Sequence, residues 1–279
     1  MPTKPIELYY LCNGRKDRAM KLSIITVNLN NRDGLQKTID SVVSQTFRDF
    51  EWIVIDGGST DGSKELIEQY ADHFAYWVSE PDKGVYNAMN KGVKVAKGEY
   101  INFMNSGDCF ASATVLADVF GTPHDADVIF GYMMRDVIDG PYNNESMMKT
   151  EISWIDLYRD GFPHQSSFIS KNLFEKYGLY DESLKAVADW KFFVEAFVYN
   201  NSTVEFVPRK ISIYASNGIS DLYGKEERAK VIKELFPQMV LNDIPKIEAY
   251  NMIHKNWFTR KLYYVLYKYA KWHDKYVNK

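Results

Sequence analysis

The chain has 279 residues, a formal net charge of −3 and 15% aromatic residues. Its 16 glycines, 9 prolines and 2 cysteines exclude collagen-like, low-complexity and disulfide-scaffold proteins, and its slightly acidic balance argues against a nucleic-acid partner. The length suffices for one large domain or two small ones. Cys12 and Cys109 lack metal-ligand spacing and indicate a reducing compartment.

Residues 1–20 show no clear period and are predicted to form a variable extension. Charged and polar residues interrupt the apolar core that a signal peptide would need. No run in the chain approaches the ~18 apolar residues of a membrane-spanning helix. We therefore expect neither export through such a signal nor a segment that spans a bilayer.

Strands and helices alternate from residue 21 onward. Short apolar runs predict the strands, and apolar residues at helical spacing predict the helices between them. The predicted strands are 22–27, 52–56, 76–78, 100–104 and 127–132, and the predicted helices cover about 35–43, 62–72 and 86–96. Gly98 is expected to close the last helix at its C-cap position. This alternation predicts an α/β fold with a mostly parallel sheet and helices on both faces.

The second half of the sequence is less regular. Residues 133–165 are typical of strands and loops, 190–198 predict a helix, and 203–207 predict a strand. Pro237 and Pro245 are expected to mark the end of the compact region.

Polar loops follow three of the predicted strands, at 28–31, 56–62 and 105–108, and a fourth polar segment, 80–84, precedes a helix. Ligands of open parallel sheets bind beyond the carboxyl ends of the strands, so these loops predict a binding site. Lys83 at the mouth of the helix fits either a diphosphate site or a solvated turn. Neither the dinucleotide fingerprint nor the P-loop motif is present.

Taken as a set, the motifs resemble family 2 glycosyltransferases of the GT-A fold. The resemblance covers about residues 21–215, and its segments are 22–30, 52–62, 82–92, 103–108, 163–165 and 188–190. It is strongest with the bacterial branch that builds capsule, O-antigen or exopolysaccharide. It implies a Rossmann-like, mostly parallel sheet, a nucleoside diphosphate-sugar donor (a UDP-sugar foremost), a divalent Mn²⁺ or Mg²⁺ ion, and inversion at the anomeric carbon.

The resemblance also implies roles for single residues. Thr26 and Asn28 match the first-strand loop that contacts the nucleotide, and Asp56 matches the acidic residue that hydrogen-bonds the base. The full set implied to bind the nucleotide-sugar is Thr26, Asn28, Asp56, Asp82, Lys83 and Asn105.

The segment 105–108, N-S-G-D, occupies the place of the family's D-x-D motif and is a departure from it. Asp108 is the carboxylate left to hold the metal. One carboxylate together with donor phosphates can hold a hard cation, although weaker affinity or partial replacement of the metal by Lys83 stays open. The alternative for Asp108 is an ordinary turn carboxylate.

Asp189 matches the family's catalytic base, which would deprotonate the acceptor hydroxyl; the alternative is a helix N-cap. His164 has three interpretations: a loop histidine, a contact to acceptor or diphosphate, or an additional metal ligand. Trp190 belongs either to the acceptor site, stacking on a sugar, or to the core.

We expect four regions: an N-terminal extension (1–20), a nucleotide-sugar-binding half (21–132), an acceptor-binding half (133–240) and a basic, aromatic helical tail (241–279). Residues 255–279 alone carry +6, so the rest of the chain carries −9. Apolar residues recur there at helical spacing, which predicts an amphipathic helix at a membrane surface. A helix docked on the protein's own core or on a second copy is the alternative.

The leading hypothesis is an inverting, metal-dependent glycosyltransferase that extends a growing, lipid-linked surface glycan. It would work in the cytoplasm, peripheral to the inner face of the cell membrane. A second hypothesis, motivated by N-S-G-D, is a non-catalytic nucleotide-sugar-binding scaffold on a degraded GT-A fold. A third is a membrane-peripheral partner module whose tail is its main function.

Overall fold

The computed structural model describes residues 20–136, 152–215 and 220–255 and scattered positions between 259 and 269. These residues belong to two compact units, 1–225 and 226–279, and the boundary falls inside helix α8 (Ser220–Leu235). Of the predicted extension over 1–20, all but Met20 lies outside the described residues.

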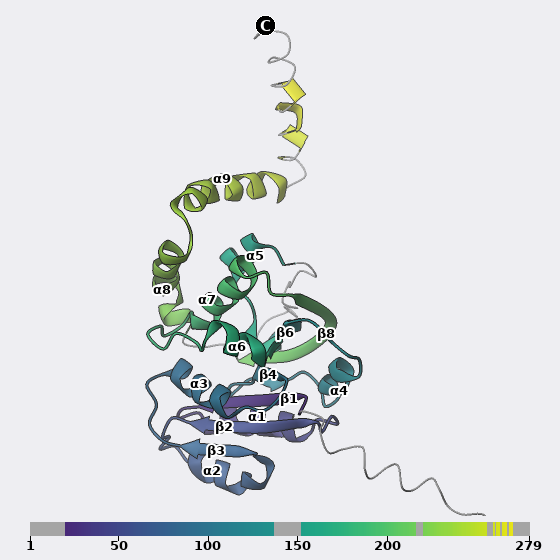
Figure 1. The fold of residues 1–279 in the computed structure, drawn as a ribbon, viewed down its shortest axis with the longest axis vertical. Helices are drawn as coiled ribbons and strands as arrows, with labels where there is room; N and C mark the ends of the chain where they lie inside the picture. Colours follow the sequence, from purple (N-terminus) through teal and green to yellow (C-terminus); the bar gives the residue numbers. More distant parts are fainter. Residues whose placement is uncertain are drawn as a thin grey trace, which may run out of the picture. The chain divides into compact units, whose positions relative to one another are not determined.

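The first unit is built on one eight-stranded sheet with the order β3-β2-β1-β4-β7-β6-β8-β5. Figure 1 shows β3, β2, β1 and β4 side by side in this order. The strands are β1 (Leu22–Asn28), β2 (Phe50–Asp56), β3 (Tyr76–Ser79), β4 (Tyr100–Phe103), β5 (Cys109–Phe110), β6 (Val128–Asp136), β7 (Ser167–Ser170) and β8 (Val204–Ala215).

The sheet is parallel where the sequence alternates and mixed beyond that. Strands β1, β2, β3 and β4 pair in parallel, whereas β7 runs antiparallel to both β4 and β6, and β5 antiparallel to β8. Every residue of β1 is buried, because helices cover both faces of a doubly wound sheet. The predicted α/β, mostly parallel architecture is confirmed.

The helices of the first unit follow the strands closely in sequence. They are α1 (Arg32–Val43), α2 (Ser63–Gln69), η1 (Ala71–His73), α3 (Val85–Val95), α4 (Val115–Phe120), α5 (Trp154–Asp160), η2 (His164–Ser166), α6 (Lys171–Tyr177), α7 (Ala188–Val194) and η3 (Glu195–Tyr199). Helix α1 begins after Asn31, whose side chain accepts a hydrogen bond from the amide of Gly34. It buries Leu35, Ile39 and Val42 against the sheet, as their helical spacing predicts.

Three sequence predictions about elements are wrong. Helix α3 ends at Val95, and Gly98 is no C-cap: a Cβ there would collide with the backbone of Ser23, so glycine allows close approach to β1. Pro245 lies inside helix α9 (Gln238–Lys255) instead of ending the compact region. The segment 133–165, expected to be strands and loops, contains helix α5, whose start a Ser153–Asp156 capping box stabilises.

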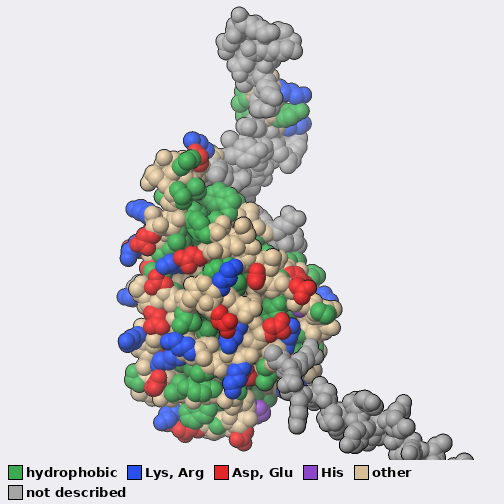
Figure 2. Space-filling view, viewed as in Figure 1, with side chains coloured by type: hydrophobic (Ala, Val, Ile, Leu, Met, Phe, Trp, Pro, Cys, Tyr) green, Lys and Arg blue, Asp and Glu red, His purple; other side chains and the backbone are tan. Residues whose placement is uncertain are grey.

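The second unit contains the end of α8, α9 and helical residues between 259 and 269. The large apolar side chains described in this last stretch are exposed, as are its lysines: Lys261, Leu262, Tyr264, Val265, Leu266, Lys268 and Tyr269. Figure 2 shows hydrophobic and basic side chains together there, whereas basic and acidic side chains intermingle on the visible face of the first unit. In the part of the chain that the structure describes, no helix is long and apolar enough to cross a membrane.

Candidate active site

Three of the predicted polar loops meet at one edge of the sheet. Asn28 and Asp56 are register partners at the carboxyl ends of β1 and β2, and Asn105 follows β4, which is the other neighbour of β1. The Asn28 amide donates to Asp56 Oδ1 at 2.8 Å. The parallel pairing therefore places the predicted nucleotide-site residues of two strands in direct contact.

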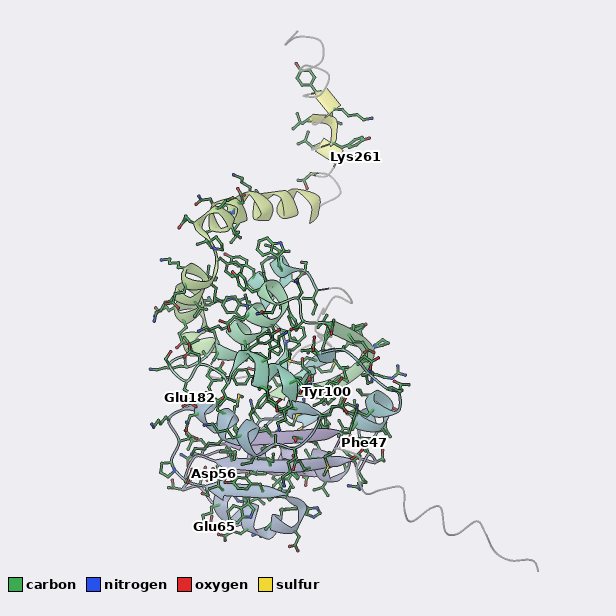
Figure 3. The ribbon with its side chains drawn as sticks, in the orientation of Figure 1. Phe47, Asp56, Glu65, Tyr100, Glu182 and Lys261 are labelled. Carbon is green, nitrogen blue, oxygen red and sulfur yellow. The ribbon has the colours of Figure 1, made fainter. Side chains whose placement is uncertain are left out.

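Asp56, labelled in Figure 3, is a fully buried carboxylate, and hydrogen bonds from three side chains hold it. Its Oδ1 accepts from Asn28 and from the Ser59 hydroxyl at 2.5 Å, and its Oδ2 accepts from the Ser79 hydroxyl at 2.6 Å and the Ser59 amide at 3.0 Å. Burial raises the pKa of Asp56, but these hydrogen bonds together outweigh it and hold the pKa below its ordinary value. Asp56 is therefore a charged group fixed in place at the end of β2.

The loops after β1 and β2 are tied to each other. The Asn30 amide N–H donates to Ser59 Oγ at 2.7 Å, and the Asn30 side chain accepts from the Thr60 amide at 2.9 Å. Asp61 accepts from the backbone of Arg32 at 2.8 Å, at the start of α1. These contacts build one rigid rim from two loops that are about 30 residues apart in sequence.

Two predicted site residues have their side chains in the protein interior. Thr26 is fully buried in β1, and its hydroxyl accepts from the Trp52 indole N–H at 3.0 Å. Trp190 is also buried, and its indole N–H donates to the Leu157 carbonyl at 2.7 Å. Their predicted contacts with nucleotide and acceptor stay predictions.

The segment before α3 approaches the same rim. Asp82 Oδ1 accepts from the Gly84 amide at 2.9 Å, and Gly84 has a φ of +122°, which favours glycine. A Cβ on Gly57 would lie 2.5 Å from Asp82 Oδ2, so the backbone after β2 passes directly beside this carboxylate. Lys83 is exposed beside Asp82, at the start of an eleven-residue helix.

Thr38 of α1 hydrogen-bonds the backbone of the turn at 105–108. The Thr38 hydroxyl donates to the carbonyls of Asn105 and Asp108 at 3.2 and 2.7 Å and accepts from the Gly107 amide at 3.0 Å. Asp108 is only 4% exposed. Within the described residues, no three His, Cys, Asp or Glu side chains gather as a metal site.

Asp189 lies in the first turn of α7, where three parts of the chain converge. Its Oδ2 is 2.8 Å from His164 Nδ1 on η2, and its Oδ1 accepts from the Tyr86 hydroxyl of α3 at 2.7 Å. His164 Nε2 faces Asn105 Nδ2 at 3.4 Å, which links this group to the loop after β4. The N-cap of α7 is Val187, so Asp189 is no N-cap.

The surroundings of Asp189 keep it ionised. Burial raises the pKa of Asp189, but its hydrogen bond and Coulombic interaction with His164, together with the Tyr86 hydrogen bond, bring the pKa below the ordinary value. The same proximity and burial raise the pKa of Tyr86 well above its usual value, so Tyr86 is a neutral donor. The side chain of Asp189 remains 15% exposed and that of His164 14%.

Sequence reasoning missed two site residues on α3: Tyr86, and Asn90, which holds the loop around Tyr180. Asn90, buried on the same face of α3 one turn later, bonds both the amide and the carbonyl of Tyr180 and also donates to Glu182. Tyr86 and Asn90 stand four residues apart, a spacing that brings two polar side chains to one helix face. That polar pair on an otherwise apolar face is the signal that could have revealed them.

The chain has an α/β fold of the GT-A type, and comparison with known proteins gives its family. Residues 23–179 match the glycosyl transferase family 2 domain, and the chain belongs to this family. An uncharacterized glycosyltransferase of Mycobacterium tuberculosis is 35% identical over 182 residues, covering 64% of this chain and 69% of that protein. A PGL/p-HBAD biosynthesis glycosyltransferase of Mycobacterium bovis is 32% identical over 192 residues, covering 64% and 70%.

Solved structures share the fold at low sequence identity. The Staphylococcus aureus TarS fragment 1–349 in complex with UDP has a TM-score of 0.60 and 20% identity, covering 76% of this chain and 64% of that one. The mannosyltransferase PcManGT from Pyrobaculum calidifontis, in complex with GDP-Man and Mn²⁺, has a TM-score of 0.54 and 15% identity, covering 71% and 58%. This chain thus spans less than two thirds of either structure. Asp189 lies beyond the family match at 23–179, so its role depends on the geometry described above.

Proposed function

We propose that this glycosyltransferase inverts the anomeric centre and moves a sugar from a nucleoside diphosphate donor to a growing glycan. The observation that carries the proposal is the ionised Asp189, partly exposed and linked through His164 to the loop after β4. The acceptor oxygen would attack the anomeric carbon while the bond to the diphosphate breaks. Asp189 would accept the hydroxyl proton, a task that typically contributes ~10²–10⁴-fold.

A UDP-sugar is the donor that we propose. Structural neighbours were solved with UDP, UDP-GlcNAc or GDP-Man, and the rim around Asn28 and Asp56 lies where such nucleotides would bind at a sheet edge. Asp82 and Lys83 would contact the nucleotide or its diphosphate at the start of α3, where backbone amides and the helix dipole favour negative charge.

We also propose that Mn²⁺ or Mg²⁺ binds with the donor. The Asp108 carboxylate and the buried Asn105 Oδ1, which lacks a hydrogen-bond partner, are oxygen ligands of the kind that a hard cation prefers. Donor phosphates would complete the ligand set. When bound, such an ion neutralises the charge that develops on the departing diphosphate.

A lipid-linked surface glycan is the acceptor that we propose, at the inner face of the cell membrane. The exposed apolar and basic side chains between 261 and 269 support surface contact, because anionic lipid attracts each basic residue by about 1 kcal/mol. Deletion of 255–279 is expected to abolish binding to anionic vesicles in a flotation assay and to spare transfer to a soluble acceptor in detergent. Loss of transfer in detergent would favour the partner-module hypothesis.

Donor binding is the direct test of the proposed function. The melting temperature is measured with UDP-, GDP- and dTDP-sugars, with and without Mn²⁺. We expect one donor class to raise it, because a ligand that binds only the folded state stabilises that state. If no donor raises the melting temperature or is turned over, the proposal fails. Binding without metal-dependent turnover would favour the scaffold hypothesis, which the single carboxylate of N-S-G-D motivates.

A further inference from the structure

Each carboxylate oxygen of Asp189 has a hydrogen-bond partner on a different element of the chain. The Tyr86 hydroxyl donates to Oδ1 at 2.7 Å from α3, and His164 Nδ1 lies 2.8 Å from Oδ2 on the far side of the carboxylate. The two partners are 103 and 25 residues away in sequence. Both carboxylate oxygens are therefore fixed before any substrate arrives.

The direction of the second hydrogen bond follows from charge. An ionised carboxylate only accepts hydrogen bonds, so the imidazole nitrogen 2.8 Å from Oδ2 must carry a proton. The ring thus donates through Nδ1 whatever the state of Nε2, which faces Asn105. A hydrogen bond from Nδ1–H to a carboxylate is a common way in which the orientation of a histidine ring and that of its carboxylate partner are fixed.

Building on the proposed function, we propose that Tyr86 and His164 are positioning residues that clamp Asp189 in the orientation needed to take the acceptor proton. Tyr86 is the second residue of α3, and the start of that helix is the proposed diphosphate contact. His164 reaches back to Asn105 of the proposed donor loop. The clamp thereby ties the base to both structures that would hold the donor.

The described groups around Asp189 allow a sharp electrostatic test. The titratable side chains that interact with it are His164, Tyr86 and Tyr180, and burial and proximity to Asp189 keep both tyrosines neutral by raising their pKa values. Burial of Asp189 opposes ionisation, and the clamp reverses this effect. Removal of one clamp donor should therefore raise the pKa of Asp189 and move the acid limb of the kcat profile to higher pH.

A matched pair of substitutions separates the roles of the two imidazole nitrogens. In His164→Asn the side-chain amide can stand in for Nδ1, whereas in His164→Gln it stands in for Nε2. The clamp predicts that His164→Asn is at least ~10-fold more active than His164→Gln, whose kcat falls by roughly 10- to 100-fold, as for one lost hydrogen bond to a charged group. The reverse order would overturn the proposal in favour of a ligand contact through Nε2.

A second pair controls for buried tyrosine hydroxyls. Tyr86→Phe removes the bond to Asp189, whereas Tyr180→Phe removes a buried hydroxyl without a hydrogen-bond partner. We expect Tyr86→Phe to lower kcat by roughly 10- to 100-fold with little change in donor KM and to move the acid limb upward. Tyr180→Phe should keep the wild-type acid limb. Equal profiles for both variants would overturn the clamp.

An NMR measurement tests the clamp without activity. In ¹⁵N-histidine-labelled full-length protein, the His164 signal, assigned by its loss in His164→Gln, should report a protonated Nδ1. A bare Nδ1 would overturn the proposal even in an active enzyme. If no donor is turned over but Nδ1 is protonated and shifts in Tyr86→Phe, the proposed function fails while the clamp geometry holds.

Discussion

Asp56 is a buried carboxylate and Asp189 a partly exposed one, and both have lowered pKa values, but their side-chain hydrogen-bond donors come from different parts of the chain. The donors of Asp56 all lie between residues 28 and 79, within the parallel strands β1 to β3 and their loops. The side-chain donors of Asp189 come from α3 and η2, two elements that meet only in the folded molecule. The first carboxylate therefore belongs to a rim that neighbouring parallel strands build, and the second depends on contacts that no strand pairing fixes, one of which spans 103 residues.

This difference predicts different consequences when each charge is removed. Asp56 accepts four hydrogen bonds, so loss of its charge should lower the stability of the protein and change the shape of the loops after β1 and β2. Asp189 has two side-chain donors and a backbone hydrogen bond from Trp190, and its side chain remains partly exposed, so its loss should lower the rate of transfer.

The largest expected effect is that of Asp189→Asn on transfer. The amide keeps the size of the side chain but cannot accept the acceptor proton, so kcat should fall by ~10²–10⁴-fold. Donor affinity, measured by calorimetry, should stay near that of the wild type. Retained transfer would assign the base to another residue, and lost donor binding would place Asp189 in the donor site.

Asp56→Asn should have the opposite pattern. The side-chain NH₂ of asparagine would face the amide and hydroxyl groups that donate to the carboxylate of Asp56, so some of these hydrogen bonds would be lost. The free energy of unfolding should therefore fall by about 2–3 kcal/mol, as for a charge-assisted hydrogen bond. Urea unfolding measures this loss, and donor affinity should fall with it. A stable variant with normal donor affinity would show that the rim does not depend on this charge.

The same contrast explains how much of the site the sequence could predict. Asn28, Asp56 and Asn105 follow parallel strands, whose carboxyl ends share one edge, so strand periodicity alone was enough to place them together. Local patterns likewise placed the first four predicted strands within two residues of their observed bounds, whereas the fifth, predicted over 127–132, extends to Asp136.

Long-range contacts escaped the same reasoning. The Tyr86–Asp189 contact spans 103 residues, and β7, the strand between β4 and β6, is a four-residue segment without a distinctive pattern. Thr26 shows a further limit: its place on β1 was predictable, but whether its hydroxyl faces a ligand or Trp52 depends on the packing of β2.

Acid titration of stability should sharpen the comparison. The folded pKa of Asp56 lies below the unfolded value near 3.8, so its contribution to stability is fully present above about pH 5 and is lost as the pH falls through the folded pKa. Wild-type stability should therefore decline below about pH 5, and Asp56→Asn should take up about one proton fewer on unfolding in that range. Parallel stability profiles for the two proteins would contradict the network assigned to Asp56.

The smallest expected effect concerns the contact between the rim and the segment before α3. Gly57 has no left-handed φ, so alanine is sterically allowed by the backbone, but its Cβ would lie 2.5 Å from Asp82 Oδ2. Gly57→Ala should displace the Asp82 carboxylate and disturb its bond to the Gly84 amide, which weakens donor binding by roughly 3- to 10-fold, within the range for one hydrogen bond.

The Gly57–Asp82 contact can be isolated by a double-mutant cycle. In an Asp82→Ala background the carboxylate is absent, so Gly57→Ala should have little further effect on donor affinity measured by calorimetry. Additive losses would instead assign the effect to Leu29, whose Cδ1 would lie 3.2 Å from the added Cβ. The two outcomes distinguish a carboxylate that shapes the donor site from a loop whose apolar packing does so.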